Sequence, residues 1–406
     1  MAITPLASSV ISGSPTFYRG CTNEANNEVL VVTNNNNLIR YSTNTYNVTS
    51  SSTIFASCAG VALINAASAV LCTSGVSQAQ FYELSSGYAQ TISAPNSSSN
   101  GKSQIIAGDP TTGTVIYIVA SGSISLVKVT SSFTATALSP PTYNSGDAGW
   151  TCIINKSSGR WYLGSISGGI YEIDNNGNIL NKILPNANIQ GLSYSNNTST
   201  LTSNYISTMV YDNNILTVGY GDGNIIFFDT TTNTQIYQHS ARSPSQSNGT
   251  MLAAASGELF GYFVNNANPG SLVFEADIVC GPMKVYDYIY ANSSGAVQDI
   301  GVNTQSSKGW WLQPDSVGTA RIYFFSISGV RATTTRTFSV QVGGIDQKCR
   351  LILLDNTSGN TLGRPILDTY MQSPATYRVP TGKTIIEVIK IGDGESASWD
   401  CSQYST

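Results

Sequence analysis

The segment from Asp109 to Val129 reads DPTTGTVIYIVASGSISLVKV and contains the pattern that decides the fold. A turn with Asp, Pro and Gly leads into an apolar run rich in β-branched residues, and a turn of Ser and Gly leads into a second run. Short runs of this kind between turn residues are typical of β-strands. The segment therefore predicts two antiparallel strands joined by a hairpin.

The second run of this segment recurs along the chain. Its counterparts are separated by 43, 45, 44, 55 and 47 residues and begin at Leu38, Phe81, Leu126, Ile170, Ile225 and Leu272. Each follows a turn, and another strand-like run precedes that turn. Four-stranded antiparallel units of about 40–50 residues, with no helical pattern between them, are the blades of a β-propeller. Six copies fit residues 1 to about 280.

The blade that contains Asp109 to Val129 resembles the loosely conserved repeats of NHL- and YVTN-type propellers. Neither the Gly-His and Trp-Asp pairs of WD40 repeats nor the Gly-Gly pair of kelch repeats recurs. The resemblance concerns the architecture and implies no catalytic residue. An open ring would expose strand edges, so its two ends have to be joined. We expect residues 3–11 to supply the missing strand of the last blade.

From about residue 281 the repeat stops and a different all-β pattern begins, with eight strand-like runs up to residue 389. This number of strands suits a β-sandwich or jelly roll. Residues 350–359 and 377–382 resemble accessory carbohydrate-binding sandwiches in their succession of strand and turn residues. The expected fold is therefore all-β: a six-bladed β-propeller over residues 1–280, followed by a jelly-roll-like β-sandwich over residues 281–406.

Composition excludes several classes of function. The chain has 406 residues, of which only 10% are charged, with 19 basic and 23 acidic side chains and a net charge of −4. No basic cluster suggests a nucleic-acid partner. Residues 1–15 lack a signal-peptide pattern, and no apolar run is long enough to cross a bilayer, so we expect no membrane insertion.

The seven cysteines contain no C-x-x-C pair, which argues against a zinc site or a redox motif. We expect most of them to be buried as small apolar side chains, and a Cys349–Cys401 disulfide is an alternative for that pair. The segment from Asp174 to Asn178 resembles a calcium-binding loop, but it lacks the acidic residue that closes such a loop. Its residues favour a hairpin turn. We expect neither a cofactor nor a metal.

Catalytic chemistry has few candidate residues. His239 is the single histidine, and no G-x-S-x-G elbow accompanies it. Most acidic residues, such as Asp109, lie in turns, where bonds to the backbone explain them. Glu83 and Glu172 occupy the same register in two blades, which favours a repeated structural role. We therefore expect no enzyme, and paired carboxylates of the glycosidase kind are the alternative.

The adjacent pair Trp310-Trp311 is the predicted ligand-binding site. Neighbouring side chains of a strand point to opposite faces, so one indole would fill the sandwich core and the other would lie on the outer surface. That surface would be a platform for a glycan or a protein partner. Core packing of the pair is the alternative, while Trp150, Trp161 and Trp399 are expected in the core.

Few ions, abundant Asn, Ser, Thr and Tyr, and strand-rich segments resemble the composition of virion surface proteins such as phage tail, fibre or capsid-decoration components. This resemblance implies a non-enzymatic protein of the virion or the extracellular space. It would make assembly contacts with other virion proteins or with its own copies, or attach to host-surface glycans. The alternatives are a carbohydrate-active enzyme or secreted lectin with an accessory sandwich, and an exported adhesin.

Overall fold

The computed structural model of the chain is built of strands, with one 3₁₀ turn, η1 (Glu24–Asn26), among the residues that it describes. Those residues are 2–55, 57–97, 104–119, 125–138, 150–165, 168–183, 206–212, 214–220, 224–231, 233–240, 251–255, 258–264, 271–277, 285–291, 297–315, 318–328, 336–340, 348–355, 365–372, 375–379, 383–391 and 400–405.

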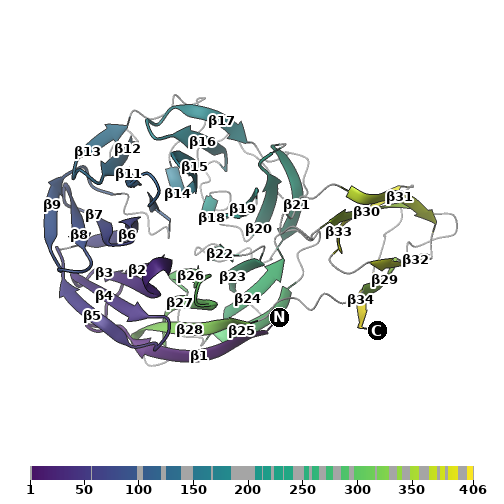
Figure 1. Ribbon diagram of the computed structural model, residues 1–406, viewed down its shortest axis with the longest axis horizontal. Helices are drawn as coiled ribbons and strands as arrows, with labels where there is room; N and C mark the ends of the chain where they lie inside the picture. The colour runs from purple at the N-terminus through teal and green to yellow at the C-terminus, as the bar shows by residue number, and fades with distance from the viewer. Residues whose placement is uncertain are drawn as a thin grey trace.

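Seven four-stranded antiparallel sheets form a ring (Figure 1). Blades 1 to 3 contain β2 (Tyr18–Asn23), β3 (Glu28–Thr33), β4 (Asn37–Ser42) and β5 (Val48–Thr53); β6 (Cys58–Asn65), β7 (Ser68–Thr73), β8 (Gln78–Glu83) and β9 (Ala89–Ser93); and β10 (Ile106–Asp109), β11 (Thr114–Val119), β12 (Ser125–Thr130) and β13 (Ala135–Leu138). Blades 4 to 6 contain β14 (Trp150–Ser157), β15 (Arg160–Ser165), β16 (Ile170–Asp174) and β17 (Ile179–Ile183); β18 (Ile206–Asp212), β19 (Ile215–Tyr220), β20 (Asn224–Asp229) and β21 (Thr234–Ser240); and β22 (Met251–Ala255), β23 (Glu258–Val264), β24 (Ser271–Asp277) and β25 (Val285–Ala291). Blade 7 contains β26 (Asp299–Asn303), β27 (Lys308–Pro314), β28 (Ala320–Ser328) and β1 (Ala2–Val10).

The β-propeller and its six predicted blades are confirmed, because each of the six repeats forms one sheet of consecutive strands. Blade 7 joins them in the ring. Its outermost strand is β1, which pairs antiparallel with β28 from Ala2 opposite Ser328 to Val10 opposite Arg321. The N-terminal segment therefore closes the last blade, as the sequence predicted for residues 3–11.

The apolar runs of the middle strands have two buried faces. In β3, Val29 and Val31 pack in the core between blades 7 and 1, whereas Leu30 and Val32 pack in the core between blades 1 and 2. Successive side chains of a strand point to opposite faces, so a strand covered on both faces needs apolar residues at nearly every position. The described cores lie between consecutive blades, from the boundary of blades 7 and 1 to that of blades 4 and 5.

The innermost strands surround the axis of the ring. Each of them is adjacent to the next, in the order β2, β6, β10, β14, β18, β22 and β26, and β26 is adjacent to β2. We call the boundary between blades 7 and 1 the seam. It brings together residues that lie about 280 positions apart in the chain.

The propeller continues past the predicted boundary at residue 280. Four strands expected in the sandwich are β25, β26, β27 and β28, which belong to blades 6 and 7. Beyond Ser328, two three-stranded sheets lie outside the ring in Figure 1. Their strands, in sheet order, are β32 (Ala375–Val379), β29 (Arg336–Val340) and β34 (Asp400–Ser405), and β31 (Pro365–Gln372), β30 (Lys348–Asp355) and β33 (Lys383–Ile391).

Candidate functional site

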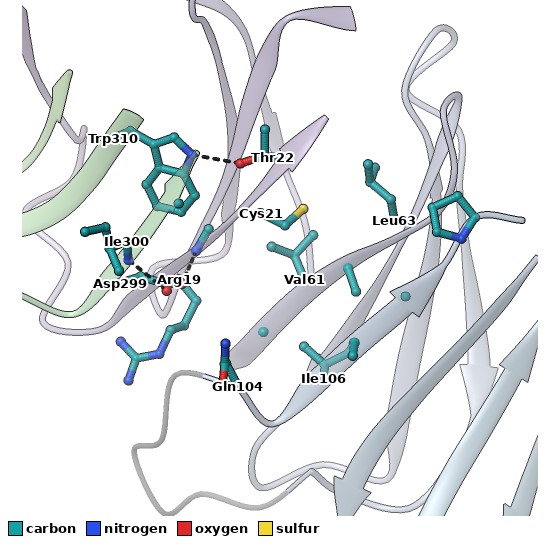
Figure 2. A pocket seen from close by; sticks show the side chains of 17 residues that line it. Arg19, Cys21, Thr22, Val61, Leu63, Gln104, Ile106, Asp299, Ile300 and Trp310 are labelled. Carbon is teal, nitrogen blue, oxygen red and sulfur yellow. Dashed lines mark hydrogen bonds between the residues drawn. The ribbon is translucent and has the colours of Figure 1, made fainter. Parts of the chain in front are cut away.

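A cavity of about 310 Å³ lies against the innermost strands of blades 7, 1, 2 and 3. In Figure 2, Asp299 and Trp310 lie on one side of the view, and Val61, Leu63 and Ile106 lie on the other. Four different blades therefore contribute to its wall. A volume of this size is at the small end of the range for ligand pockets, which starts at roughly 300 Å³.

The wall on the blade 7 side is built around a tryptophan. The Trp310 indole, from β27, lies between two glycines, because a Cβ built on Gly20 would be 2.6 Å from Cη2 and one on Gly301 would be 2.4 Å from Cζ2. Neither position has space for a side chain. The indole Nε1–H donates to Thr22 Oγ1 at 2.9 Å, which attaches blade 7 to the innermost strand of blade 1.

Asp299 crosses the seam as well. Its carboxylate accepts the Gly20 backbone N–H at 2.9 Å and the Ile300 backbone N–H at 3.0 Å. Burial raises the pKa of Asp299 to about 6, while the charge of Arg19 and the two backbone N–H groups act in the opposite direction. Desolvation of the charged form is therefore the larger effect.

Arg19, which is only 4% exposed, is the second buried charged residue of the cavity wall. The guanidinium lies over the Phe17 ring at 4.5 Å from its centroid, and Nη1 donates to the Tyr18 carbonyl at 3.1 Å. Burial lowers the pKa of Arg19, and Asp299 opposes that shift. Since the two side chains carry opposite charges, the wall is close to electrically neutral.

Gln104 forms the wall toward blades 4 and 5. Its Nε2 donates to the Met209 carbonyl at 2.7 Å, and its Oε1 accepts the Met209 backbone N–H at 2.6 Å. The same oxygen accepts the Cys152 thiol at 2.8 Å. One amide side chain, two residues before β10 of blade 3, therefore connects the innermost strands of blades 4 and 5, and these bonds fix its orientation.

Three side chains of the wall keep hydrogen-bonding capacity that the described part of the chain does not use. The Thr22 hydroxyl accepts from Trp310, and its own hydrogen has no acceptor there. Gln104 Nε2 uses one of its two hydrogens, and the Asp299 carboxylate accepts two bonds where it has room for about four. The cavity thus presents both donors and acceptors.

The predicted tryptophan pair is divided by the sheet of blade 7. Trp310 lines the cavity and is 1% exposed, while Trp311 is 3% exposed on the opposite face. Trp311 stacks on Tyr323 with ring centroids 4.9 Å apart and planes at 8°. The expectation of one indole on an outer surface is wrong, because a blade within a ring has a neighbour on each face. Their role in ligand binding stays a prediction.

The acidic residues considered for catalysis make structural bonds. Glu172 accepts Lys156 Nζ at 3.0 Å and Arg160 Nη1 at 3.1 Å, and Glu83 accepts the Ser86 hydroxyl. Asp109 accepts the backbone N–H groups of Thr111 and Thr112 within its turn. The turn role predicted for Asp109 is confirmed, whereas Glu83 and Glu172 bond different kinds of partner and do not repeat one role.

The hairpin turn expected at Asp174 is confirmed. Asp174 accepts the Asn176 and Asn178 backbone N–H groups at 2.7 and 2.9 Å, and these contacts form the hairpin between β16 and β17. His239 lies near the end of β21, opposite Ile225. Among the described residues, no three His, Cys, Asp or Glu side chains gather where they would hold a metal ion.

Four cysteines are described as free thiols: Cys21, Cys58, Cys72 and Cys152. All but Cys21 are buried in cores, as predicted. Cys21 lines the cavity, and burial raises the pKa of its thiol to about 12, so it is a thiol at neutral pH. The side chains of Cys349 and Cys401 lie outside the described residues.

Sequence reasoning missed Arg19, Gln104 and Asp299. One signal was present for Arg19, since a charged residue between Tyr18 and Gly20 interrupts a strand-like run. Gln104 and Asp299 carry no such signal, because their partners lie on other blades.

No helix in the described ranges has the length and apolar character of a membrane span.

Comparison with known proteins agrees with this architecture. No family model matches the chain. None of the curated proteins matches it either. The β-propeller domain of Cps50 (Swd1) from Myceliophteria thermophila is similar in structure, with a TM-score of 0.54 and 12% sequence identity. The match covers 79% of this chain and 100% of that domain, and it supports the fold alone.

Proposed function

We propose that this protein is a non-catalytic virion surface protein, which makes assembly contacts or attaches to host-surface glycans. The observation that carries the proposal is that charged side chains of the ring bond one another within a blade, which is a structural role and not a catalytic one. Glu28 binds Arg40 at 2.6 Å, and Asp315 binds Arg321 at 2.5 Å. Together with the Glu172 cluster, these ion pairs join strands within a blade.

The outer surface of the ring supports the same proposal. The outermost strand of blade 1, β5, reads VTSSST and is largely exposed, with no charged residue. The outermost strand of blade 2, β9, reads AQTIS and is also free of charge. Hydroxyl-rich neutral strands suit contact with sugars and with other polar protein surfaces, because neither contact has to desolvate an ion.

The C-terminal strands would form the second module of this protein. Each of the two three-stranded sheets is antiparallel, and β32 and β33, from different sheets, lie next to each other. We propose that the two sheets pack face to face as a jelly-roll-like β-sandwich. In a virion this module would serve either as the anchor to other virion proteins or copies, or as a carbohydrate-binding attachment module.

A carbohydrate-active enzyme or a secreted lectin is the second candidate. The Asp299 carboxylate favours it, because this group lines the cavity and its pKa is raised to about 6. A raised carboxyl pKa is a property of general acids in glycoside hydrolysis, although that reaction also needs a second carboxylate on the other side of the scissile bond.

The test uses the purified full chain on a glycan array and in a polysaccharide degradation assay. Binding without release of reducing ends supports an attachment protein, and release at enzymatic rates would favour the second candidate. The genes next to its coding sequence give an independent test. Neighbours that encode portal, capsid or tail proteins support a virion protein, and neighbours of metabolic function contradict it.

A further inference from the structure

We infer that the cavity between blades 7, 1, 2 and 3 binds one neutral sugar residue. This inference rests on the glycan attachment proposed above and gives it a site. The first argument is charge. A cationic ligand drawn to Asp299 would meet Arg19, and an anionic ligand drawn to Arg19 would meet Asp299. The opposite charges of these two wall residues therefore favour a ligand without net charge.

The second argument is the hydrogen-bonding capacity of the wall. The Thr22 hydroxyl and Gln104 Nε2 each have one hydrogen that no described residue accepts, and Asp299 has unused acceptor capacity. A ligand that uses all three groups has to accept from two of them and donate to the third. Sugar hydroxyl groups do both, and a vicinal pair of them matches a carboxylate.

The third argument is the order of the wall before any ligand arrives. Gln104 is fixed by two bonds to Met209, Thr22 by the Trp310 indole, and Asp299 by two backbone N–H groups. The polar atoms are therefore held in place, which lowers the entropy lost on binding. Thr22 and Asp299 belong to strands β2 and β26, and Gln104 lies in a turn two residues before β10.

The fourth argument is size and apolar surface. The volume of about 310 Å³ accommodates a ligand of one sugar ring and is small for an oligosaccharide. Val61, Leu63 and Ile106 form the wall opposite Asp299 in Figure 2. This surface would contact the C–H groups of a sugar ring, whose hydroxyl groups would face the polar side.

The test is a titration of the full chain with single sugars, followed by calorimetry and by ligand-observed NMR. The neutral probes are glucose, galactose, mannose and N-acetylglucosamine, and the charged probes are glucuronic acid and glucosamine. We expect saturable binding of at least one neutral sugar, with a dissociation constant of about 1 mM or below, and weaker binding of both charged sugars.

Variants locate the binding. Asp299→Asn and Thr22→Val should each weaken it about tenfold, because the first exchanges an acceptor oxygen for a donor and the second removes the hydroxyl. Glu83→Gln is the matched control for the carboxylate and should bind as the original chain does. Cys21→Met would fill part of the cavity and should also weaken binding, which keeps the test decisive if Asp299→Asn fails to fold.

Two outcomes would overturn the inference. One is a folded chain that binds no neutral single sugar up to about 50 mM. The other is binding that Thr22→Val and Cys21→Met leave unchanged, which would place the sugar elsewhere. A positive glycan array beside either result would keep the proposed attachment function and reject this cavity as its site, so the two failures are distinguishable.

Discussion

The seam and the boundary between blades 2 and 3 solve the same packing problem in different ways. Between blades 2 and 3, one apolar core extends from Ala59 to Val129, and a Cβ on Gly108 would be 1.9 Å from the Leu63 carbonyl oxygen. Backbone lies directly against backbone there. At the seam, a whole indole separates the innermost strands of blades 7 and 1, and polar groups accompany it.

Directed bonds are the second difference. Across the seam, Asp299 accepts from Gly20, Glu24 accepts from the Thr304 backbone and hydroxyl, and Asn303 donates to Thr43. These partners are 260 to 280 residues apart. Joining distant segments costs more chain entropy than joining neighbours, and hydrogen bonds fix the register where the local chain does not. The long-range boundary is therefore the more polar and more specific one.

The largest effect should follow removal of the strand that completes the ring. Deletion of residues 2–10 leaves the edge of β28 unpaired and opens blade 7, so we expect loss of cooperative folding and aggregation. Circular dichroism melting and size-exclusion chromatography measure both. As a control, Leu6→Thr and Val10→Thr keep β1 and change only exposed side chains, so they should melt close to the original temperature. A truncated chain with an unchanged melting temperature would contradict closure by β1.

The next largest effect concerns the indole at the seam. Trp310→Ala should lower the free energy of unfolding by about 3–5 kcal/mol, as for other buried aromatic residues. Gly301→Ala should cost about 1–3 kcal/mol alone, because its Cβ would overlap the ring. In the Trp310→Ala background the same glycine substitution should cost little. Denaturant titration of the original chain, the two single variants and the double variant gives the coupling free energy between positions 301 and 310. Additive effects would show that the Trp310 indole is not what restricts position 301.

The buried carboxylate gives the seam a pH dependence. Burial raises the pKa of Asp299 from 3.8 to about 6, so the folded state binds its proton more tightly than the unfolded state does. Its contribution to stability is fully present below about pH 4 and is lost as the pH rises through 6, a change of about 3 kcal/mol. Asp299→Asn should remove this part of the stability profile between pH 4 and 8.

Chemical denaturation at several pH values measures that profile. Glu83→Gln is the control, since the Glu83 carboxylate bonds the Ser86 hydroxyl in its own blade, away from the seam, and this variant should keep the pH dependence of the original chain. An Asp299→Asn chain whose stability falls between pH 4 and 7 as steeply as that of the original chain would assign the effect to another group.

The smallest effect compares two equivalent turns. Tyr46 and Phe133 both have positive φ, at 63° and 62°, and each ring contacts the preceding blade: Tyr46 meets Phe324 at 5.3 Å, and Phe133 meets Phe81 at 4.4 Å. In the corresponding turn of blade 2, Gly87 has φ 72°. Replacement by Gly relieves backbone strain and removes an aromatic contact. We expect a net loss of about 1 kcal/mol for Phe133→Gly and a larger loss for Tyr46→Gly.

The difference between these two variants is the informative quantity, and thermal melting measures it. The Tyr46 ring also contacts Lys308 of blade 7, whose Nζ lies 6.0 Å from the ring centroid, and this contact is lost with the ring. Equal losses of stability at both positions would show that the turn at the seam contributes no more to stability than the equivalent turn at the boundary of blades 2 and 3.

The repeat predicted the propeller because each blade carries its own turn and strand residues. The continuation into blade 7 had a signal as well, since Ala320 lies 48 residues after Leu272, close to the earlier intervals. It was hidden because the fourth strand of that blade comes from the other end of the chain. The same separation hid the cavity: Asp299, Thr22 and Gln104 meet only when blades 7, 1 and 3 are in place.

Strand β1 has a consequence for synthesis on the ribosome. Its partner β28 is translated about 310 residues later, which at about 5–20 residues per second is a delay of tens of seconds. During that time six blades emerge in succession while the two strands that unite the disc are not yet together. Chaperones that shield strand edges should therefore act on the nascent protein until β28 has emerged from the ribosome.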